Sequence, residues 1–227
     1  MPGQRETLIA LFEEHFIESQ EATGMTLIGQ FRDLNNPDRF VWLRGFADME
    51  SRARQLQEFY GGPIWKKHRQ AANATMIDSD NVFLLRPARP GSGFSLEQFE
   101  RPQLGASDDS KALVVAAIFQ LEDANQERVV ELFEKEFAPT LTESGARVLA
   151  TFLTENHPNT FPALPVREDE NVFAAFLRFP DPETHQQQAA NIGSYVHGEG
   201  KRSGLIKRAP EILLLTPTPR SLLRGGD

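Results

Sequence analysis

Apolar residues near the start of the chain follow helical spacing and then give way to strand-like runs. The helix is indicated by positions i, i+3, i+4 and i+8, namely Leu8, Leu11, Phe12 and Phe16. Two apolar runs follow at 25–31 and 40–46, and the Asn-Pro-Asp at 36–38 favours a turn between them. These residues predict a helix followed by two strands.

A second helix and a final strand complete this first unit. Asp48 is a good N-cap, and apolar residues recur behind it at helical spacing, namely Met49, Ala53, Leu56 and Phe59. The short apolar run 81–87 ends in proline and predicts a strand. The expected order is therefore helix, strand, strand, helix, strand.

The same order returns in the second half of the chain. LFEEHF begins at residue 11 and LFEKEF at residue 132, an offset of 121 that holds for the helix and the strand after it. Farther on, matching segments keep their order while the loops change length, which is typical of a duplicated unit. The apolar run 112–121 precedes the helix of the second copy and predicts a strand there. The second copy then has the order of a ferredoxin-like unit along the chain: strand, helix, strand, strand, helix, strand. The first copy lacks this opening strand, which predicts a three-stranded first sheet with an exposed edge.

These elements predict an α+β protein with two tandem ferredoxin-like repeats that form a fold of the dimeric α+β-barrel type. We expect a first repeat at 1–88, a linker at 89–110 rich in Gly, Pro, Ser and acidic residues, and a second repeat at 111–217. A mobile tail is expected at 218–227. Two sheets lying face to face would cover each other, which supplies a physical reason for the duplication.

Composition narrows the classes of partner. The formal net charge of −8 disfavours general binding to nucleic acid or to an anionic membrane, because both require a positive field. The chain has no cysteine, which excludes disulfides and thiolate sites. We find no apolar run long enough for a transmembrane segment and no signal-peptide pattern at the start, and we expect a cytoplasmic protein.

Residues 31–87 resemble bacterial proteins of the NIPSNAP family, whose fold is the dimeric α+β barrel. The most similar segments are NPDRFVWLRGF, FYGGPIW and the ANATM that leads into DSDNV. The resemblance implies the fold of this family. It implies no reaction, because the family as a whole has no agreed one. The barrel superfamily includes monooxygenases, haem-handling enzymes, lactone isomerases and proteins that only bind ligands.

Strand alternation in 40–46 suggests the first candidate site residues. It puts Phe40, Trp42, Arg44 and Phe46 on one face and the smaller aliphatic residues on the other. We expect the aliphatic face to pack beneath helices and the face with Trp42 and Arg44 to look into the barrel. An arginine in such a cavity could hold a carboxylate or phenolate; the alternative is an arginine paired with an acid at a sheet edge.

The segment after the second helix supplies the other candidates. We expect a Gly-Gly-Pro loop whose polar and aromatic side chains form the rim of the pocket, with Tyr60, Trp65, His68, Arg69 and Asn73 as ligand-binding residues. His68 could act as a general base, although a solvated surface histidine is the commoner situation. Asn73 could equally stabilise a turn.

No metal and no cofactor are predicted. The five histidines show no HxH or HExxH spacing, and the sequence has no P-loop, GxGxxG or GxSxG motif. The catalytic residues stay unknown.

Three functions remain open. The first is binding of a small organic molecule, aromatic or anionic, in a barrel cavity. The second is a non-catalytic interaction or scaffold protein, with homo-oligomers forming through the open sheet edge. The third is an enzyme of the monooxygenase or haem-handling type.

Overall fold

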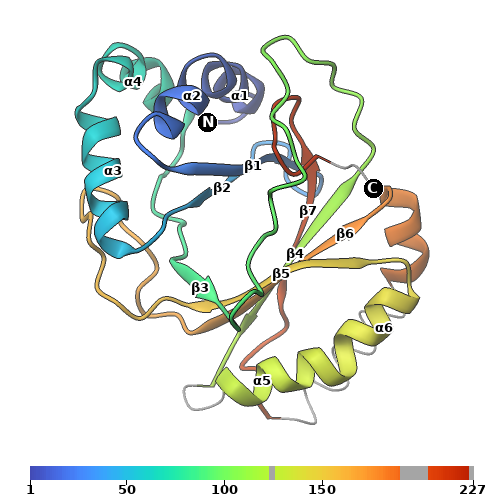
Figure 1. Ribbon diagram of the computed structural model, residues 1–227. Coiled ribbons are helices and arrows are strands. Elements are labelled where there is room, and N and C mark those ends of the chain that lie inside the picture. Colours follow the sequence, from blue (N-terminus) through green and yellow to red (C-terminus); the bar gives the residue numbers. More distant parts are fainter. Residues whose placement is uncertain (123–125, 190–203, 225–227) are drawn as a thin grey trace.

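The computed structural model describes residues 1–122, 126–189 and 204–224 and shows an α+β fold around one curled antiparallel sheet (Figure 1). The first half contains α1 (Arg5–Leu11), the π-helix η1 (Phe12–Phe16), α2 (Ile17–Glu21), β1 (Thr26–Asp33), β2 (Phe40–Gly45), α3 (Met49–Gly61), α4 (Pro63–Thr75) and β3 (Leu85–Pro87). The second half contains β4 (Leu113–Gln120), α5 (Gln126–Leu132), the π-helix η2 (Phe133–Phe137), α6 (Ala138–Glu143), β5 (Arg147–Thr154), β6 (Val172–Phe179) and β7 (Glu211–Pro217). A further helix covers 182–189.

Local signals set the helix boundaries in the first half. The Asp48 side chain accepts a hydrogen bond from the Ser51 amide at 2.6 Å and so caps α3. Pro63 stands at the first position of α4, where a missing amide proton costs nothing. Only Gly62 separates the two helices.

The seven strands form one sheet in the order β2-β1-β7-β4-β6-β5-β3. The second half keeps the ferredoxin-like order β7-β4-β6-β5, but β7 also pairs with β1, and β3 pairs with β5. The predicted three-stranded first sheet is therefore wrong, as is the prediction of two sheets face to face. The last strand of each half pairs with the other half and joins the two into one sheet.

The two ends of this sheet are β2 and β3. All the pairings along the strand order are antiparallel, so β2 and β3 run in the same direction and cannot close the sheet with an antiparallel pair. One strand running the opposite way would be needed between them. The outer edge of β2 is the open edge expected from the sequence.

The two halves repeat each other in register. Gln30 pairs with Trp42 on β1–β2, and the corresponding Thr151 pairs with Ala175 on β5–β6. Both strand pairs contain a register shift at the same place, between Leu27 and Gly29 in the first half and between Val148 and Ala150 in the second.

Each face of the sheet has its own core. Beneath the helices lie two clusters, one per half, built around Phe12, Phe16 and Leu56 in the first and Phe133 and Phe137 in the second. The inner face of the curled sheet is also packed, by a third cluster whose buried members include Phe31, Phe176 and Leu215. The interior is thus an apolar core, as in other small barrels.

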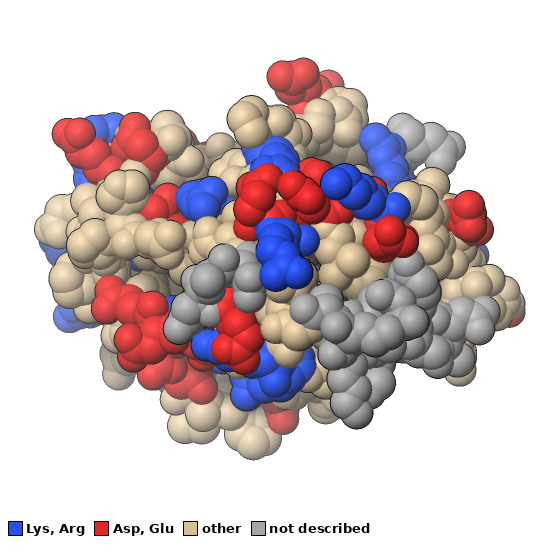
Figure 2. Space-filling model, turned by 90° about the horizontal axis from the view of Figure 1, so that it is seen from below, with Lys and Arg blue, Asp and Glu red and all other residues tan. Residues whose placement is uncertain are grey.

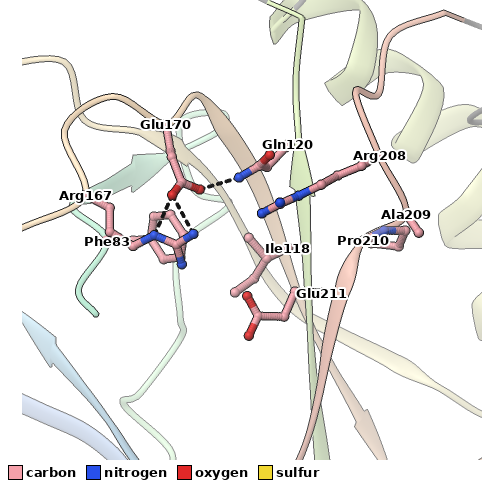
Figure 3. A pocket seen from close by; sticks show the side chains of 9 residues that line it. All are labelled: Phe83, Ile118, Gln120, Arg167, Glu170, Arg208, Ala209, Pro210 and Glu211. Carbon is pink, nitrogen blue, oxygen red and sulfur yellow. Dashed lines mark hydrogen bonds and ion pairs between the residues drawn. The ribbon is translucent and has the colours of Figure 1, made fainter. Parts of the chain in front are cut away.

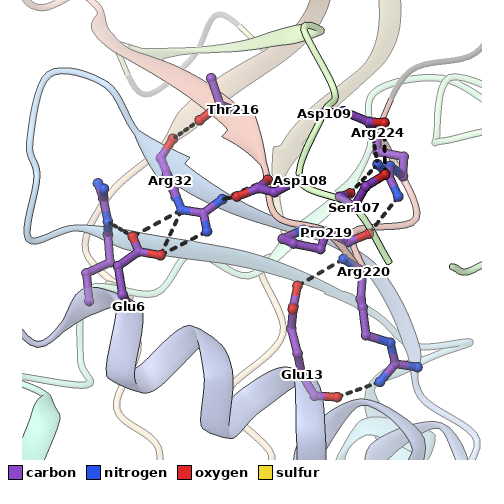
Figure 4. Close-up of polar contacts among 11 residues, drawn as sticks. Glu6, Glu13, Arg32, Ser107, Asp108, Asp109, Thr216, Pro219, Arg220 and Arg224 are labelled. Carbon is purple, nitrogen blue, oxygen red and sulfur yellow. Dashed lines mark hydrogen bonds and ion pairs between the residues drawn. The ribbon is translucent and has the colours of Figure 1, made fainter. Parts of the chain in front are cut away.

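The segment 89–110 connects the halves and also fills the inner face. Phe94, Leu96 and Phe99 pack against the inner cluster, and the Phe94 ring lies 5.1 Å from that of Phe176. The Arg101 guanidinium reaches Glu21 at 2.5 Å, and Asp108 pairs with Arg32 at 3.1 Å (Figure 4). The expected linker therefore contributes to the core.

Residues 218–224 are buried or half-buried, which corrects the prediction of a mobile tail for this stretch. Thr218, Arg220, Ser221 and Leu223 are all buried. The Arg220 amide donates to the Glu13 carboxylate at 2.9 Å (Figure 4). Its guanidinium pairs with Glu18. The final residues, 225–227, lie outside the described residues.

Candidate functional site

The candidate site lies between the helices and the sheet of the first half, on the outer face of β1 and β2. Phe40, Trp42 and Phe46 pack against the cluster beneath these helices, whereas Val41 and Leu43 pack against the inner cluster. The prediction that Trp42 and Arg44 look into the barrel is therefore wrong. On β2 the smaller aliphatic side chains face the concave inner side of the sheet, and the aromatic ones face the convex side beneath the helices.

Aromatic rings pack against one another between these helices and the two strands. Trp42 lies 5.6 Å from Phe12, Trp65 lies 5.5 Å from Phe16, and Tyr60 lies 4.8 Å from Trp65, all between ring centroids. Edge-to-face and tilted contacts of this kind stabilise a cluster beyond the area it buries. Trp42, Tyr60 and Trp65 thus belong to one continuous aromatic wall.

Two arginines stand within this apolar layer without a counter-charge. Arg44, on β2, is half-buried and donates to the Gln20 Oε1 at 3.2 Å and to the Tyr60 hydroxyl at 3.4 Å. Arg52, on α3, is 4% exposed and donates to neutral oxygens of Asn159 and Thr160. Among the described residues no acidic side chain forms an ion pair with either one. Burial, and then the nearby charge of Arg44, lowers the pKa of the Arg52 guanidinium.

The second half shows how the same positions look without polar groups. Leu141 stands where the first half has Gln20, and Leu177 where it has Arg44. Both leucines are buried in the apolar cluster beneath the second set of helices. The fold can therefore be built with leucine at both positions, and it does not require the arginine.

Buried amides add to the polar character of the first half. The Gln30 side chain is fully buried, and neither of its polar atoms has a hydrogen-bond partner among the described residues. Gln30 pairs with Trp42 across the strands, and so lies on the helix-facing side. The Gln55 Oε1, on α3, is also buried without a partner. Unpaired buried amides in a native protein need an explanation, and a bound ligand or water would supply one.

The segment predicted as a Gly-Gly-Pro loop is helical. Trp65, His68, Arg69 and Asn73 lie on α4, because Gly62 is the only residue between the two helices. Trp65 faces the aromatic wall, whereas Arg69 and Asn73 are exposed. The structure therefore brings Trp42, Arg44, Tyr60 and Trp65 together and leaves Arg69 and Asn73 outside.

His68 stands at the margin of the site, where its ring stacks on His15 with centroids 3.8 Å apart. Desolvation, followed by the charges of His15 and Lys67, lowers the pKa of His68. The neutral imidazole is therefore favoured.

Sequence reasoning missed three residues of this site: Gln20, Arg52 and Phe161. Arg52 shares a helix face with Leu56 and Phe59 at i, i+4 and i+7, a spacing that could have revealed it. Gln20 likewise follows Phe16 by four residues. Phe161 comes from the second half and stacks on Tyr60 at 5.7 Å, a contact that no local pattern indicates.

A cavity of about 270 Å³ opens at one end of the barrel (Figure 3). Its floor includes Ile118, and Arg167 bonds to Glu170 at 2.6 Å and covers the Phe83 ring at 4.4 Å. Gln120 also donates to Glu170. Arg167 and Glu170, both half-buried, thus neutralise each other, in contrast to Arg44 and Arg52, for which the described residues show no ion pair.

Surface charge gives no sign of a polyanion site on the face seen in Figure 2, where acidic and basic side chains are intermixed. In the described ranges no three His, Asp or Glu side chains gather as they would around a metal ion. No described helix is long and apolar enough to cross a membrane.

Comparisons with known proteins support the fold. No family model matches the chain, and no curated protein matches it. Two solved structures are similar, both named "putative monooxygenase". The protein from Lactobacillus acidophilus NCFM is 13% identical, with a TM-score of 0.52 over 98% of this chain and 93% of that one. The protein from Fusobacterium nucleatum is 12% identical, with a TM-score of 0.56 over 100% of this chain and 92% of that one. At such identities the likeness shows a shared fold, the α+β barrel built from ferredoxin-like units.

Proposed function

We propose that the protein binds a small aromatic anion between the helices and the sheet of its first half, with Arg44 and Arg52 as the charged groups. The observation that supports this most is the pair of neighbouring guanidinium groups, which have no carboxylate partner in the part of the chain that the structure describes. A buried or half-buried charge is normally paired, because leaving it unpaired costs several kcal/mol. A carboxylate or phenolate would supply the missing charge.

The surroundings favour an aromatic ligand over a purely polar one. Tyr60, Trp65 and Phe161 form an apolar wall next to the two arginines. A planar ring can stack against such a wall while its acidic group meets a guanidinium. A pocket of this kind is mostly apolar, with a few polar groups that fix orientation.

Benzoate is a suitable probe, because the only two tryptophans of the chain, Trp42 and Trp65, both lie in this site. We expect benzoate to change the tryptophan fluorescence excited at 295 nm. This change should reach a constant value at high benzoate concentration. Benzamide, of similar shape and no charge, should bind at least about tenfold more weakly, because it cannot form an ion pair with a guanidinium.

Substitution identifies the charged groups. Arg44→Met and Arg52→Met should each weaken benzoate binding by about tenfold or more. The matched control is Arg54→Met, because Arg54 is exposed on the same helix as Arg52. If all three variants bound benzoate with the same affinity as the wild-type protein, the proposal would be refuted.

Oxygenation is a second candidate function, favoured by the names of the two similar structures. Anthrone is a suitable probe, because its conjugate base is an aromatic anion that Arg44 could stabilise. Oxidation of its methylene to a ketone consumes one O2 and releases one water, so no added reductant is needed. Protein-dependent oxygen uptake that is lost in Arg44→Met would support this function; uptake equal to the protein-free rate would exclude it for this probe.

We retain membership of the NIPSNAP family as a proposal that rests on the sequence resemblance of residues 31–87.

A further inference from the structure

The connection between β5 and β6 crosses to the first half and covers the candidate site. Within it, residues 159–164 hold their own shape: the Asn159 amide group donates to the Leu164 carbonyl at 2.8 Å and accepts from the Phe161 amide at 3.0 Å. Phe161 and Leu164 pack against the first-half cluster. This short piece is thus held together by its own hydrogen bonds, as compact surface loops are.

Its polar attachment to the first half is centred on Arg52. The Arg52 Nη1 donates to the Asn159 Oδ1 at 2.9 Å and to the Thr160 Oγ1 at 3.3 Å. The Thr160 hydroxyl in turn donates to the Met49 carbonyl at 2.9 Å. Both acceptors of the guanidinium are neutral, so they bond to it without neutralising its charge.

Its apolar attachment is a ring stack. The Phe161 ring lies nearly parallel to that of Tyr60, at 17° and 5.7 Å between centroids. The Tyr60 hydroxyl is the group to which Arg44 donates. Phe161 therefore covers the same tyrosine that borders the arginine pair.

We propose that residues 159–164 are the gate of this anion site and that Phe161 occupies the place of the ligand's ring when the site is empty. The inference rests on the proposed function. An incoming carboxylate replaces the neutral acceptors on Arg52. It forms an ion pair with the guanidinium, which is stronger than a hydrogen bond to a neutral oxygen. The aromatic ring of the ligand replaces Phe161 on Tyr60, and the loop opens to admit it.

Rapid mixing with benzoate tests the gate. If opening precedes binding, the observed rate of the tryptophan fluorescence change reaches a plateau at high benzoate, and the plateau is the opening rate. Thr160→Val removes one contact to Arg52 and one to Met49, and Phe161→Leu removes the stack. We expect each to raise the plateau about fivefold, as the loss of one hydrogen bond or one stacked pair implies.

The control is Ala163→Ser, a change at an exposed position of the same loop, for which the plateau should not change. Two variants with different contacts protect the test against a folding defect in either one. A wild-type plateau that neither Thr160→Val nor Phe161→Leu changes, or a rate that rises linearly without a plateau, would overturn the gate while leaving anion binding intact. Absence of any wild-type response to benzoate would instead refute the proposed function, and the gate with it.

Ring chemistry gives a second readout. Cyclohexanecarboxylate carries the same charge as benzoate but cannot stack on Tyr60. We expect wild-type protein to prefer benzoate by about three- to tenfold, in line with the energy of one aromatic pair, and Tyr60→Leu to lose that preference. If the wild-type protein bound the two acids with equal affinity, this would contradict the proposal that the ligand's ring takes the place of Phe161 on Tyr60.

Discussion

Arg44 and Gln20 are costly residues at positions where the same fold accepts leucine. Their counterparts in the second half, Leu177 and Leu141, are 4% exposed in a continuous apolar cluster. A guanidinium in such a layer loses hydration and here gains only neutral partners. Residues that lower stability without serving the fold are expected where a protein binds or reacts.

Copying the second half into the first tests this cost. The double variant Gln20→Leu, Arg44→Leu removes the charge together with its main acceptor, so the Gln20 amide oxygen is not left unpaired. We expect the free energy of unfolding to rise by about 1 kcal/mol and the melting temperature by about 2–4 °C, while benzoate binding is lost. Thermal melts with and without benzoate measure both effects.

The reverse change, Leu177→Arg, is the control, because it places an unpaired charge in the apolar second half. It should lower the free energy of unfolding by about 3 kcal/mol or more. A double variant less stable than the wild-type protein would show that Arg44 contributes to the fold.

Single residues of the site could be predicted from the sequence only in part. Trp42, Arg44, Tyr60 and Trp65 were all expected near a ligand, and the structure does bring them together. Alternation along β2 separated the two faces correctly, but it could not say which face lies beneath helices. That depends on the curvature of the whole sheet.

At the scale of elements, the repeated phrases LFEEHF and LFEKEF contain the two π-helices, Phe12–Phe16 and Phe133–Phe137. The repeat predicted correctly that the two segments share a structure. The apolar spacing predicted regular α-helices, because a wide turn leaves no separate mark on that spacing. In the first half the π-helix buries Glu13, whose carboxylate accepts from the Arg220 amide. π-helices are rare in proteins, but those that occur are often found at functional sites. The position of η1 over the arginine site agrees with this tendency.

The contact between η1 and α4 should respond to pH through His68, whose ring stacks on that of His15. The pKa of His68 is lowered by desolvation first and then by His15 and Lys67, while Glu14 acts in the opposite direction. The unfolded chain therefore takes up a proton more readily as the pH falls below about 6.5, the usual value for imidazole. The contribution of the neutral His68 to the free energy of unfolding is therefore fully present above that pH and is lost progressively below it.

We expect the melting temperature of the wild-type protein to fall more between pH 7.5 and pH 5.5 than that of His68→Gln. The pKa of His185 is also lowered by burial and acts in the same direction, but it is present in both proteins and cancels in the comparison. Parallel pH profiles for the two proteins would mean that the stacked pair does not influence folding in this range.

At the scale of the whole molecule, the halves are joined by exchanged strands. β7 pairs with both β4 and β1, and β3 leaves the first half to pair with β5. The sequence showed two units because their internal periodicity repeats. It could not show the exchange, because strand pairing between distant segments depends on the sheet as a whole. The packing of Phe94 and Phe99 from the connecting segment and Leu223 from the C-terminal end was hidden for the same reason.

This interlocking predicts that the protein unfolds as one cooperative unit instead of as two repeats. Leu56→Ala removes a buried side chain from the first-half cluster, and Val130→Ala does so in the second. Because the sheet and the inner core are shared, each variant should lower the same single calorimetric transition, Leu56→Ala by about 2–4 kcal/mol. The calorimetric and van't Hoff enthalpies should agree in all three proteins. Two resolved transitions, with Leu56→Ala lowering one and Val130→Ala the other, would show that the halves fold independently and that the exchanged strands add little to their stability.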